Sequence, residues 1–132
     1  MLGATFSGKE AAFLGKHELC RLATVSADGR PHVVPVNYVF REGRFYVAVD
    51  YATRKLKNIR SHNRVALVVD SFRPQGAVMV EGPARIIEKG AEFRSLYALF
   101  HEKFAWVRSD PWTEGQAPFI EVNPDNKVSW GL

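Results

Sequence analysis

Short extended runs joined by tight turns fill most of this 132-residue chain and restrict it to an antiparallel β architecture. The runs 20–26 and 31–40 flank a turn at 27–30 with Asp-Gly at its centre, a strong signal for a β-hairpin. A second turn at 41–44 leads into the run 45–50. The remaining predicted strands lie at 64–71, at 77–88 with a bend at Gly82-Pro83, at 119–122 and at 127–130. About six strands in hairpin succession predict a mainly β fold, either a small antiparallel barrel or a sandwich.

Three short helices are predicted between these strands. Ser7 and Glu10 have the spacing of a capping box, which opens a helix that ends near residue 18. A second helix is predicted over 53–62 and a third over 91–104. The apolar residues of the third helix follow the spacing i, i+3, i+4 and i+7: Phe93, Leu96, Tyr97 and Phe100.

Length and composition predict one globular domain over residues 1–132. Hydrophobic residues make up 46% and charged residues 24%, ordinary values for a soluble protein. No apolar run reaches the roughly 20 residues of a membrane span, and the N-terminus lacks the pattern of a signal peptide. We therefore expect a cytoplasmic protein without a membrane partner. The lone cysteine, Cys20, excludes an internal disulfide framework, and its neighbours predict a buried, unreactive thiol.

Cations stand at the start of the predicted helix 53–62, where they are electrostatically disfavoured. Thr53 suits the N-cap, where its hydroxyl can accept a backbone N–H of the first turn. The first turn carries the positive end of the helix dipole, yet Arg54, Lys55 and Lys57 add three more positive charges. Cations and free backbone N–H groups together predict an anion site, with a phosphate group as its natural ligand. The alternative is an ordinary solvated basic face.

No catalytic side chain and no metal site can be identified from the sequence. The histidines are scattered, without a pair at i, i+3 or i, i+4: His17, His32, His62 and His101. Neither a dinucleotide-binding nor a Walker-type glycine motif is present. The aromatic residues are expected mostly in the core, with a few available to stack on a planar ligand or to fill a subunit interface.

Four stretches together resemble the flavin-binding split barrels related to pyridoxamine 5′-phosphate oxidase. They are residues 21–36, 53–59, 63–67 and 80–85, and the closing residues 128–131 resemble the last strand of the short, single-domain members. The resemblance covers about residues 10–132. It implies a six-stranded antiparallel split barrel, a homodimer, and FMN in two equivalent clefts at the dimer interface.

The resemblance also assigns cofactor-binding residues by position. Thr53, Arg54 and Lys55 match the phosphate-binding group of the family, and Lys57 matches an additional phosphate contact in its single-domain branch. Two strands match those that lie along the isoalloxazine ring: Val34, Pro35, Val36 and Asn37 in the first, and Val47, Ala48 and Val49 in the second. The ring itself does the hydride or electron chemistry, so no catalytic side chain is implied.

Two departures from the family pattern indicate a substrate other than pyridoxamine 5′-phosphate. The vitamin-forming oxidases have a glutamine where this chain has Ala77, and Gln75 stands two residues early. The sequence also ends at Leu132, without the longer segment that binds substrate in those oxidases. The sequence thus predicts an FMN-binding oxidoreductase of this family with another substrate.

The sequence also allows cofactors and functions other than an FMN-dependent oxidoreductase. A branch of the superfamily binds an 8-hydroxy-5-deazaflavin coenzyme and shares the Asp-Gly-Arg-Pro-His hairpin and a segment seen here as Lys55-x-x-Asn58-Ile59-Arg60. The polyglutamate tail of that coenzyme suits a net charge of +4. A non-enzymatic flavin- or haem-binding protein is a second alternative, with His32 or His62 as the haem candidates. Nucleic-acid binding is not expected, because the cations cluster at a helix start instead of along strand faces.

Overall fold

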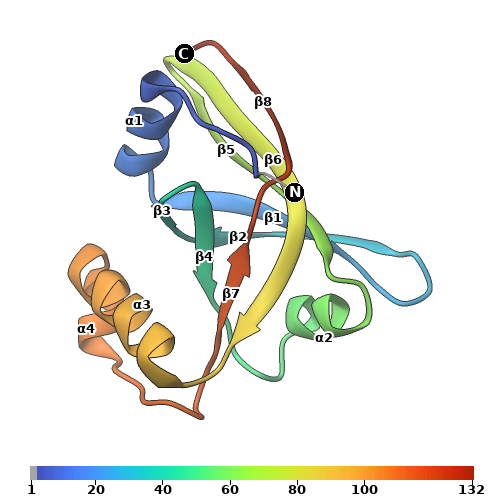
Figure 1. Ribbon diagram of the computed structural model, residues 1–132, viewed down its shortest axis with the longest axis vertical. Helices are drawn as coiled ribbons and strands as arrows, with labels where there is room; N and C mark the ends of the chain where they lie inside the picture. The colour runs from blue at the N-terminus through green and yellow to red at the C-terminus, as the bar shows by residue number, and fades with distance from the viewer. Residues whose placement is uncertain (1–2) are drawn as a thin grey trace.

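One continuous antiparallel sheet forms the framework of the computed structural model, which describes residues 3–132 (Figure 1). Its eight strands within that range are β1 (Leu19–Val25), β2 (Pro31–Asn37), β3 (Val39–Arg41), β4 (Arg44–Ala48), β5 (Arg64–Phe72), β6 (Gln75–Ile87), β7 (Phe119–Val122) and β8 (Asn126–Trp130). The strand order is β2-β1-β5-β6-β7-β4-β3, with β8 paired to β6. The predicted mainly β split barrel is confirmed, whereas the strand count of six is too low.

The predicted strand 31–40 is two strands, because the chain changes partner at Tyr38. Residues of β2 pair with β1, and residues of β3 pair with β4. Tyr38 is buried between them, where its backbone N–H donates to the carbonyl of Glu18 (3.1 Å) and its hydroxyl donates to the carbonyl of Leu14 (2.6 Å). A continuous apolar pattern does not reveal such a change of partner.

The predicted bend at Gly82-Pro83 lies where β6 passes from one half of the sheet to the other. Before the bend β6 pairs with β5 and β8, and after it with β7. Gly82 packs so closely on Asn123 that a Cβ atom would collide with the Asn123 carbonyl. The carbonyl of Pro83 accepts a hydrogen bond from the Asn123 N–H (3.0 Å). Only glycine fits this crossing of β6 over the segment between β7 and β8.

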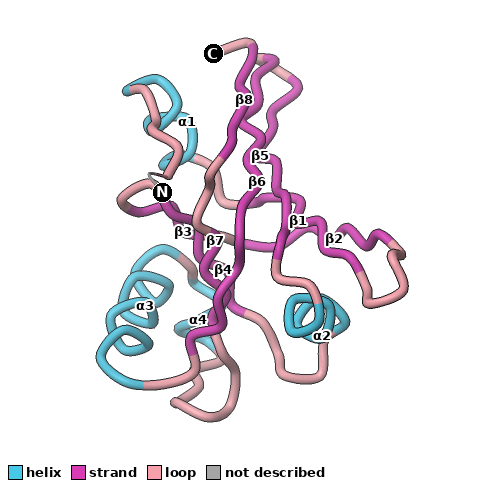
Figure 2. The backbone as a smooth tube through the Cα atoms, turned by 45° about the vertical axis from the view of Figure 1, so that its right-hand side comes forward, coloured by secondary structure: helices cyan, strands magenta, loops and turns pink. Residues whose placement is uncertain are grey.

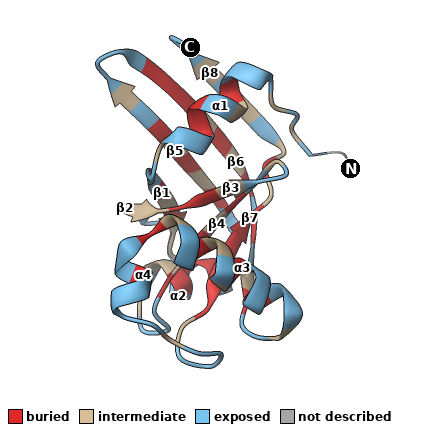
Figure 3. Ribbon diagram, turned by 90° about the vertical axis from the view of Figure 1, so that its left-hand side faces the viewer, coloured by how far each residue is buried: buried red, intermediate tan, exposed pale blue. Residues whose placement is uncertain are grey.

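The bent sheet encloses one apolar core and carries a second on its outer side (Figure 3). The inner core draws side chains from both halves of the sheet, including Leu22, Leu67, Val78 and Ile120. The outer core lies under α3 (Gly90–Lys103) and α4 (Ala105–Ser109), where Phe100 packs on Phe119. Strand β7 is buried along its whole length because it lies between these two cores. The five-residue helix α4 was not predicted from the sequence.

Helix α2 (Arg54–Ser61) packs against β1, away from α3 and α4 (Figure 2). Its Leu56 and Ile59 enter the inner core. Asn58 is buried and donates a hydrogen bond to the Thr24 hydroxyl of β1 (3.0 Å). No helix within residues 3–132 has the length and apolar character needed to cross a membrane.

Helix α1 (Gly8–Lys16) begins with the predicted capping box, which the structure confirms. Glu10 also accepts hydrogen bonds from Lys127 and from Ser129 of β8, both at 2.6 Å. Burial by itself would raise the pKa of Glu10, but the hydrogen bonds from Lys127, Ser129 and the Ser7 backbone outweigh it and lower the pKa to about 2. This buried carboxylate ties the first helix to the last strand.

Replacing Glu10 with Gln is expected to destabilise the fold at pH 7 by roughly 2 kcal/mol, the order of magnitude for hydrogen bonds to a buried charge. The folded-state pKa of Glu10 is lowered, so its contribution is complete above about pH 4.5 and is lost as the pH falls toward 2. Urea unfolding at pH 7 and pH 3 should therefore show a smaller deficit at the lower pH. Glu102→Gln, on an exposed side chain, is the control, and an equal deficit at both pH values would contradict the prediction.

Candidate cofactor site

The first turn of α2 is a cationic helix N-terminus with free backbone donors. Thr53 is the N-cap as predicted, but its hydroxyl does not cap the helix. It donates instead to the carbonyl of Asp50 (2.8 Å), because residues 50–53 form a tight turn in which the Thr53 N–H bonds the same carbonyl (3.3 Å). Within residues 3–132, the backbone N–H groups of Arg54, Lys55 and Leu56 consequently have no acceptor.

The cations of this turn are also free of anionic partners. Arg54, Lys55 and Lys57 form no ion pair with any residue of the described range 3–132. In contrast, Arg64 bonds to a carboxylate through two nitrogens, and Arg85 bonds to two carboxylates through all three of its side-chain nitrogens. No residue between 3 and 132 therefore neutralises the positive charge at the start of α2.

A cavity of about 360 Å³ opens beside this turn, between α2 and the β1–β2 turn. Arg54 and Lys57 both line it, in agreement with their shared helix face at i, i+3, while Lys55 lies outside it. Asp28 also lines this cavity, and its carboxylate accepts a hydrogen bond from the Ser26 hydroxyl and pairs with Arg30 (3.2 Å). Thr53 does not line the cavity, so the predicted phosphate residues are divided between the cavity wall and the helix end.

The predicted ring-binding residues lie on β2 and at the end of β4, with Val49 directly after β4, and the two strands approach each other. Strand β2 is at one end of the strand order and pairs only with β1 within the described residues, so its outer edge is open. On β2, Val36 packs against the inner core, while Pro35 is exposed and Val34 is half-buried.

On the other strand, the side chains of Val47 and Val49 belong to the inner core, so these residues offer only their backbone to a ligand. Ala48 faces the opposite way, beneath α3 and α4. Of the predicted β4 residues, Ala48 is therefore the one whose side chain can border a ligand.

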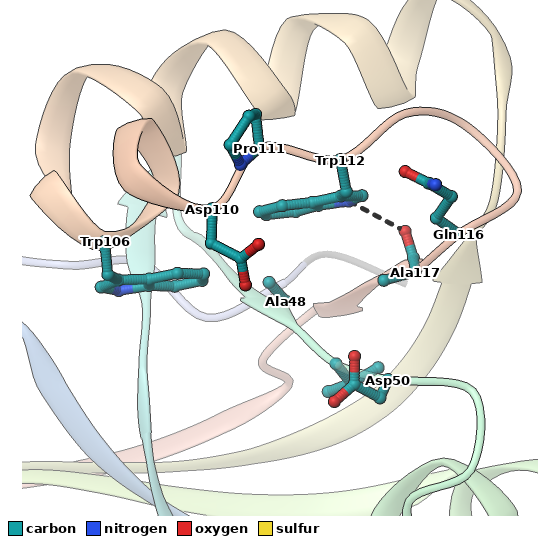
Figure 4. A pocket seen from close by; sticks show the side chains of 9 residues that line it. Ala48, Asp50, Trp106, Asp110, Pro111, Trp112, Gln116 and Ala117 are labelled. Atoms are coloured by element: carbon teal, nitrogen blue, oxygen red, sulfur yellow. Dashed lines mark hydrogen bonds between the residues drawn. The ribbon is translucent and has the colours of Figure 1, made fainter.

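A second cavity of about 430 Å³ lies over the end of β4 (Figure 4). Ala48, Val49 and Asp50 form its floor, and its wall comes from α4 and the loop that follows: Trp106, Asp110, Pro111, Trp112, Gln116 and Ala117. We call it the indole cavity. The predicted residue Asn37 supports it from outside, because its side-chain oxygen accepts a hydrogen bond from the Trp106 ring N–H (3.0 Å).

The indole cavity and the α2 N-terminus are joined by the short loop after β4. From Ala48 to Thr53 the chain advances five residues, which span at most about 17 Å. A molecule with a planar ring at one end and a phosphate at the other could therefore contact both.

The residues of the indole cavity wall were not predicted individually as site residues. Trp106, Asp110 and Trp112 belong to a stretch expected to be helix end or loop, and only the tryptophan content hinted at stacking. Cys20 is buried as predicted, and burial raises the pKa of its thiol to about 12, which excludes a reactive thiolate at neutral pH. Gln75 lines a separate cavity beside α1. Helices α1 and α2 lie at opposite ends of the molecule (Figure 1).

Comparisons with known proteins agree with this fold. The family model described as pyridoxamine 5′-phosphate oxidase matches residues 6–130. The 5a,11a-dehydrotetracycline/5a,11a-dehydrooxytetracycline reductase of Streptomyces rimosus subsp. rimosus is 34% identical over 136 residues, covering 96% of this chain and 84% of that protein.

Among solved structures, the heme storage protein HutZ from Vibrio cholerae superposes with a TM-score of 0.79 at 16% identity, over 96% of this chain and 94% of that one. A putative pyridoxamine 5′-phosphate oxidase from Lactobacillus delbrueckii gives a TM-score of 0.72 at 22% identity, over 93% of both chains. At these identities the structures show a shared fold alone.

The bent antiparallel sheet and the structural neighbours define a split-barrel fold. Because the family model matches residues 6–130 of this chain, the chain belongs to the pyridoxamine 5′-phosphate oxidase family.

Replacing Asn37 with Leu is expected to loosen Trp106, because the indole N–H loses its acceptor while the branched shape of the side chain is kept; the bond that the Asn37 amide donates to the Glu18 carbonyl (3.1 Å) is lost as well. In a Trp112→Phe/Trp130→Phe background only Trp106 emits, and acrylamide quenching of its fluorescence should rise by about twofold, because its ring N–H is no longer held by a hydrogen bond. Asn63→Leu, on an exposed loop side chain, should leave the quenching unchanged. Equal quenching in Asn37→Leu and its parent would show that the bond does not hold the indole.

Proposed function

We propose that residues 1–132 form one FMN-binding domain of an oxidoreductase, with the cofactor phosphate at the N-terminus of α2. The observation that carries the proposal is the first turn of α2, where Arg54, Lys55 and Lys57 are unpaired within residues 3–132 and three backbone N–H groups have no acceptor. An arginine fork and helix N–H groups are the donors that bind phosphate dianions. Proteins of this family usually bind flavin-type cofactors.

In this proposal the ring of the cofactor lies along β2 and β4, between the predicted residues of the two strands. The open edge of β2 would be contributed by Val34, Pro35, Val36 and Asn37. The end of β4 and the residue after it would be contributed by Val47, Ala48 and Val49. When bound, the flavin supplies the hydride or electron chemistry. The protein binds the phosphate, orients the ring and limits the access of water, so no side chain needs to act as an acid or a base.

A deazaflavin coenzyme is the alternative cofactor, since it needs the same phosphate-binding donors.

The S. rimosus relative is a reductase of an organic molecule, and we propose that this chain likewise acts on an organic molecule other than pyridoxamine 5′-phosphate. The departure at Ala77 supports this, because Ala77 is buried and Gln75 lines a cavity beside α1 that no residue of α2 borders.

The non-enzymatic alternative, haem binding, has less support. HutZ shares the fold, but the haem candidates His32 and His62 line neither the cavity beside α2 nor the indole cavity. The visible spectrum of the purified protein, with mass spectrometry of the released cofactor, separates FMN, deazaflavin and haem.

Replacing Arg54 and Lys55 together with Ala should abolish flavin retention while the fold survives, because both side chains are unpaired and outside the core. Two charge-assisted contacts to phosphate correspond to a loss of affinity of about 100-fold or more. The ratio of flavin to protein after gel filtration measures the effect.

The matched control is Arg73→Ala/Lys89→Ala, which removes the same charge from exposed sites elsewhere. Stoichiometric flavin in Arg54→Ala/Lys55→Ala would refute the phosphate site. An equal loss of flavin in the control would show that net charge, and not this site, determines flavin binding.

We further propose that the chain forms a homodimer through the outer face of the strands β2, β1, β5, β6 and β8. Side chains opposite one another on this face form apolar rows, since Val68 pairs with Met79 and Met79 with Val128. Val33 is 65% exposed and Val128 is 47% exposed on it. The family is typically dimeric, and a sheet face of this kind is unusual for a monomer.

Placing a charge at the centre of this face should separate the subunits. Val128→Glu buries a carboxylate in each half of the proposed interface, so the dimer dissociation constant should rise by at least about tenfold. Sedimentation equilibrium measures it, with Ala98→Glu on the exposed side of α3 as the control. An unchanged dimer in Val128→Glu would place the interface elsewhere.

A further inference from the structure

The two indoles of the indole cavity are held rigidly, with their ring N–H groups already engaged. Trp106 donates to Asn37 (3.0 Å) and Trp112 donates to the carbonyl of Ala117 (3.2 Å). The rings are parallel, with an interplanar angle of 5° and centroids 5.9 Å apart. Tyr97 packs edge-on against Trp112 with centroids 4.9 Å apart. Because both donors are used, the indoles offer a ligand their faces and not hydrogen bonds.

The exposure of Trp106 indicates that the two indoles do more than pack in the core. Trp106 is 43% exposed, although it stacks on Trp112 and on Phe104. A large indole fixed by a hydrogen bond and left open to solvent beside a cavity is a preformed stacking surface.

The charge of the cavity is opposite to that of the α2 N-terminus. Its lining contains the carboxylates of Asp50 and Asp110 and no lysine or arginine. Neither carboxylate forms an ion pair with another residue in the described part of the chain. A phosphate or carboxylate ligand would therefore be repelled here, whereas a planar cation would interact with the acidic side chains and with the indole faces.

The size of the cavity limits its occupant to one planar ring system. A volume of about 430 Å³ lies at the lower end of the range for small-molecule sites. Under the proposed function, the anionic cofactor is bound by the cations of α2 and would border the cavity only at Ala48 and Val49. The remaining wall of Trp106, Asp110 and Trp112 is available to a second molecule.

We propose that the indole cavity binds the substrate of the oxidoreductase, and that this substrate is a planar polycyclic compound without negative charge, preferably a cation. Its ring stacks on the face of Trp106, and its positive group lies between Asp50 and Asp110. The identification of the occupant as the substrate rests on the proposed flavin-dependent function, whereas the ligand chemistry of the cavity does not.

Three acridine-type probes of one shape and different charge test the proposal by isothermal titration calorimetry. They are proflavine as the cation, acridone as the neutral ring and acridine-9-carboxylate as the anion. Proflavine should bind at least about tenfold more tightly than the anion, because two carboxylates reverse the sign of the interaction. Trp106→Ala should weaken proflavine and acridone alike by about tenfold through lost stacking.

Asp110→Asn should weaken proflavine by about fivefold and leave acridone unchanged, a charge-specific effect that a general distortion would not produce. Glu18→Gln, an exposed carboxylate outside the cavity, is the matched control. Equal affinity for the cation and the anion, or full proflavine affinity in Asp110→Asn, would overturn the proposal.

Flavin uptake measured on the same variants separates this proposal from the proposed function. If Asp110→Asn retains flavin and Arg54→Ala/Lys55→Ala retains proflavine, the two ligands have separate sites, as proposed. Loss of flavin in Trp106→Ala together with competition between flavin and proflavine would assign the cavity to the cofactor and overturn the substrate site. A wild-type protein that takes up no flavin but discriminates the probes by charge would refute the proposed function and support the cavity chemistry.

Discussion

The close crossing of β6 over the segment after β7 is the constraint on which the rest of the structure depends. Gly82 has no side chain, so the backbone of β6 can lie against the Asn123 carbonyl and turn from one half of the sheet into the other. Because of that turn, β7 and β4 face β1 and β5 across a single core. The end of β4, the turn 50–53 and the start of α2 all follow from this placement.

Burial of the apolar face of α2 explains how its unfavourable N-terminus is kept in place. Cations near a helix N-terminus cost about 0.3–1 kcal/mol each when exposed. Burying Leu56 and Ile59 contributes about 1.5–3 kcal/mol for each side chain, and the buried bond from Asn58 to Thr24 fixes the helix on β1. The packing of two residues therefore offsets the repulsion of three cations, and the positive field at the helix start can be maintained for a ligand.

Local features of this chain could be predicted from the sequence, and features that depend on distant residues could not. The capping box of Ser7 and Glu10 lies within one helical turn, and it was predicted correctly. The start of α2 after Thr53 was also predicted, but its hydroxyl bonds Asp50 because a tight turn, invisible in the sequence pattern, precedes the helix. The indole cavity could not be predicted, since Trp106 depends on Asn37, which is 69 residues away in the sequence. The spacing of Arg54 and Lys57 was enough to place both on one cavity wall.

The candidate site is electrostatically polar, because opposite charges lie at the two ends of the short segment from β4 to α2. The carboxylates of Asp50 and Asp110 lie at the indole end, and the unpaired cations lie at the start of α2, with the loop after β4 between them. A molecule with an anionic end and an uncharged ring is therefore oriented by the field before any specific contact forms. The reverse orientation places its phosphate against two carboxylates and removes it from the helix N–H groups. The same field disfavours a substrate with a phosphate of its own at the indole end, so the charge pattern that orients the cofactor also restricts the class of substrate.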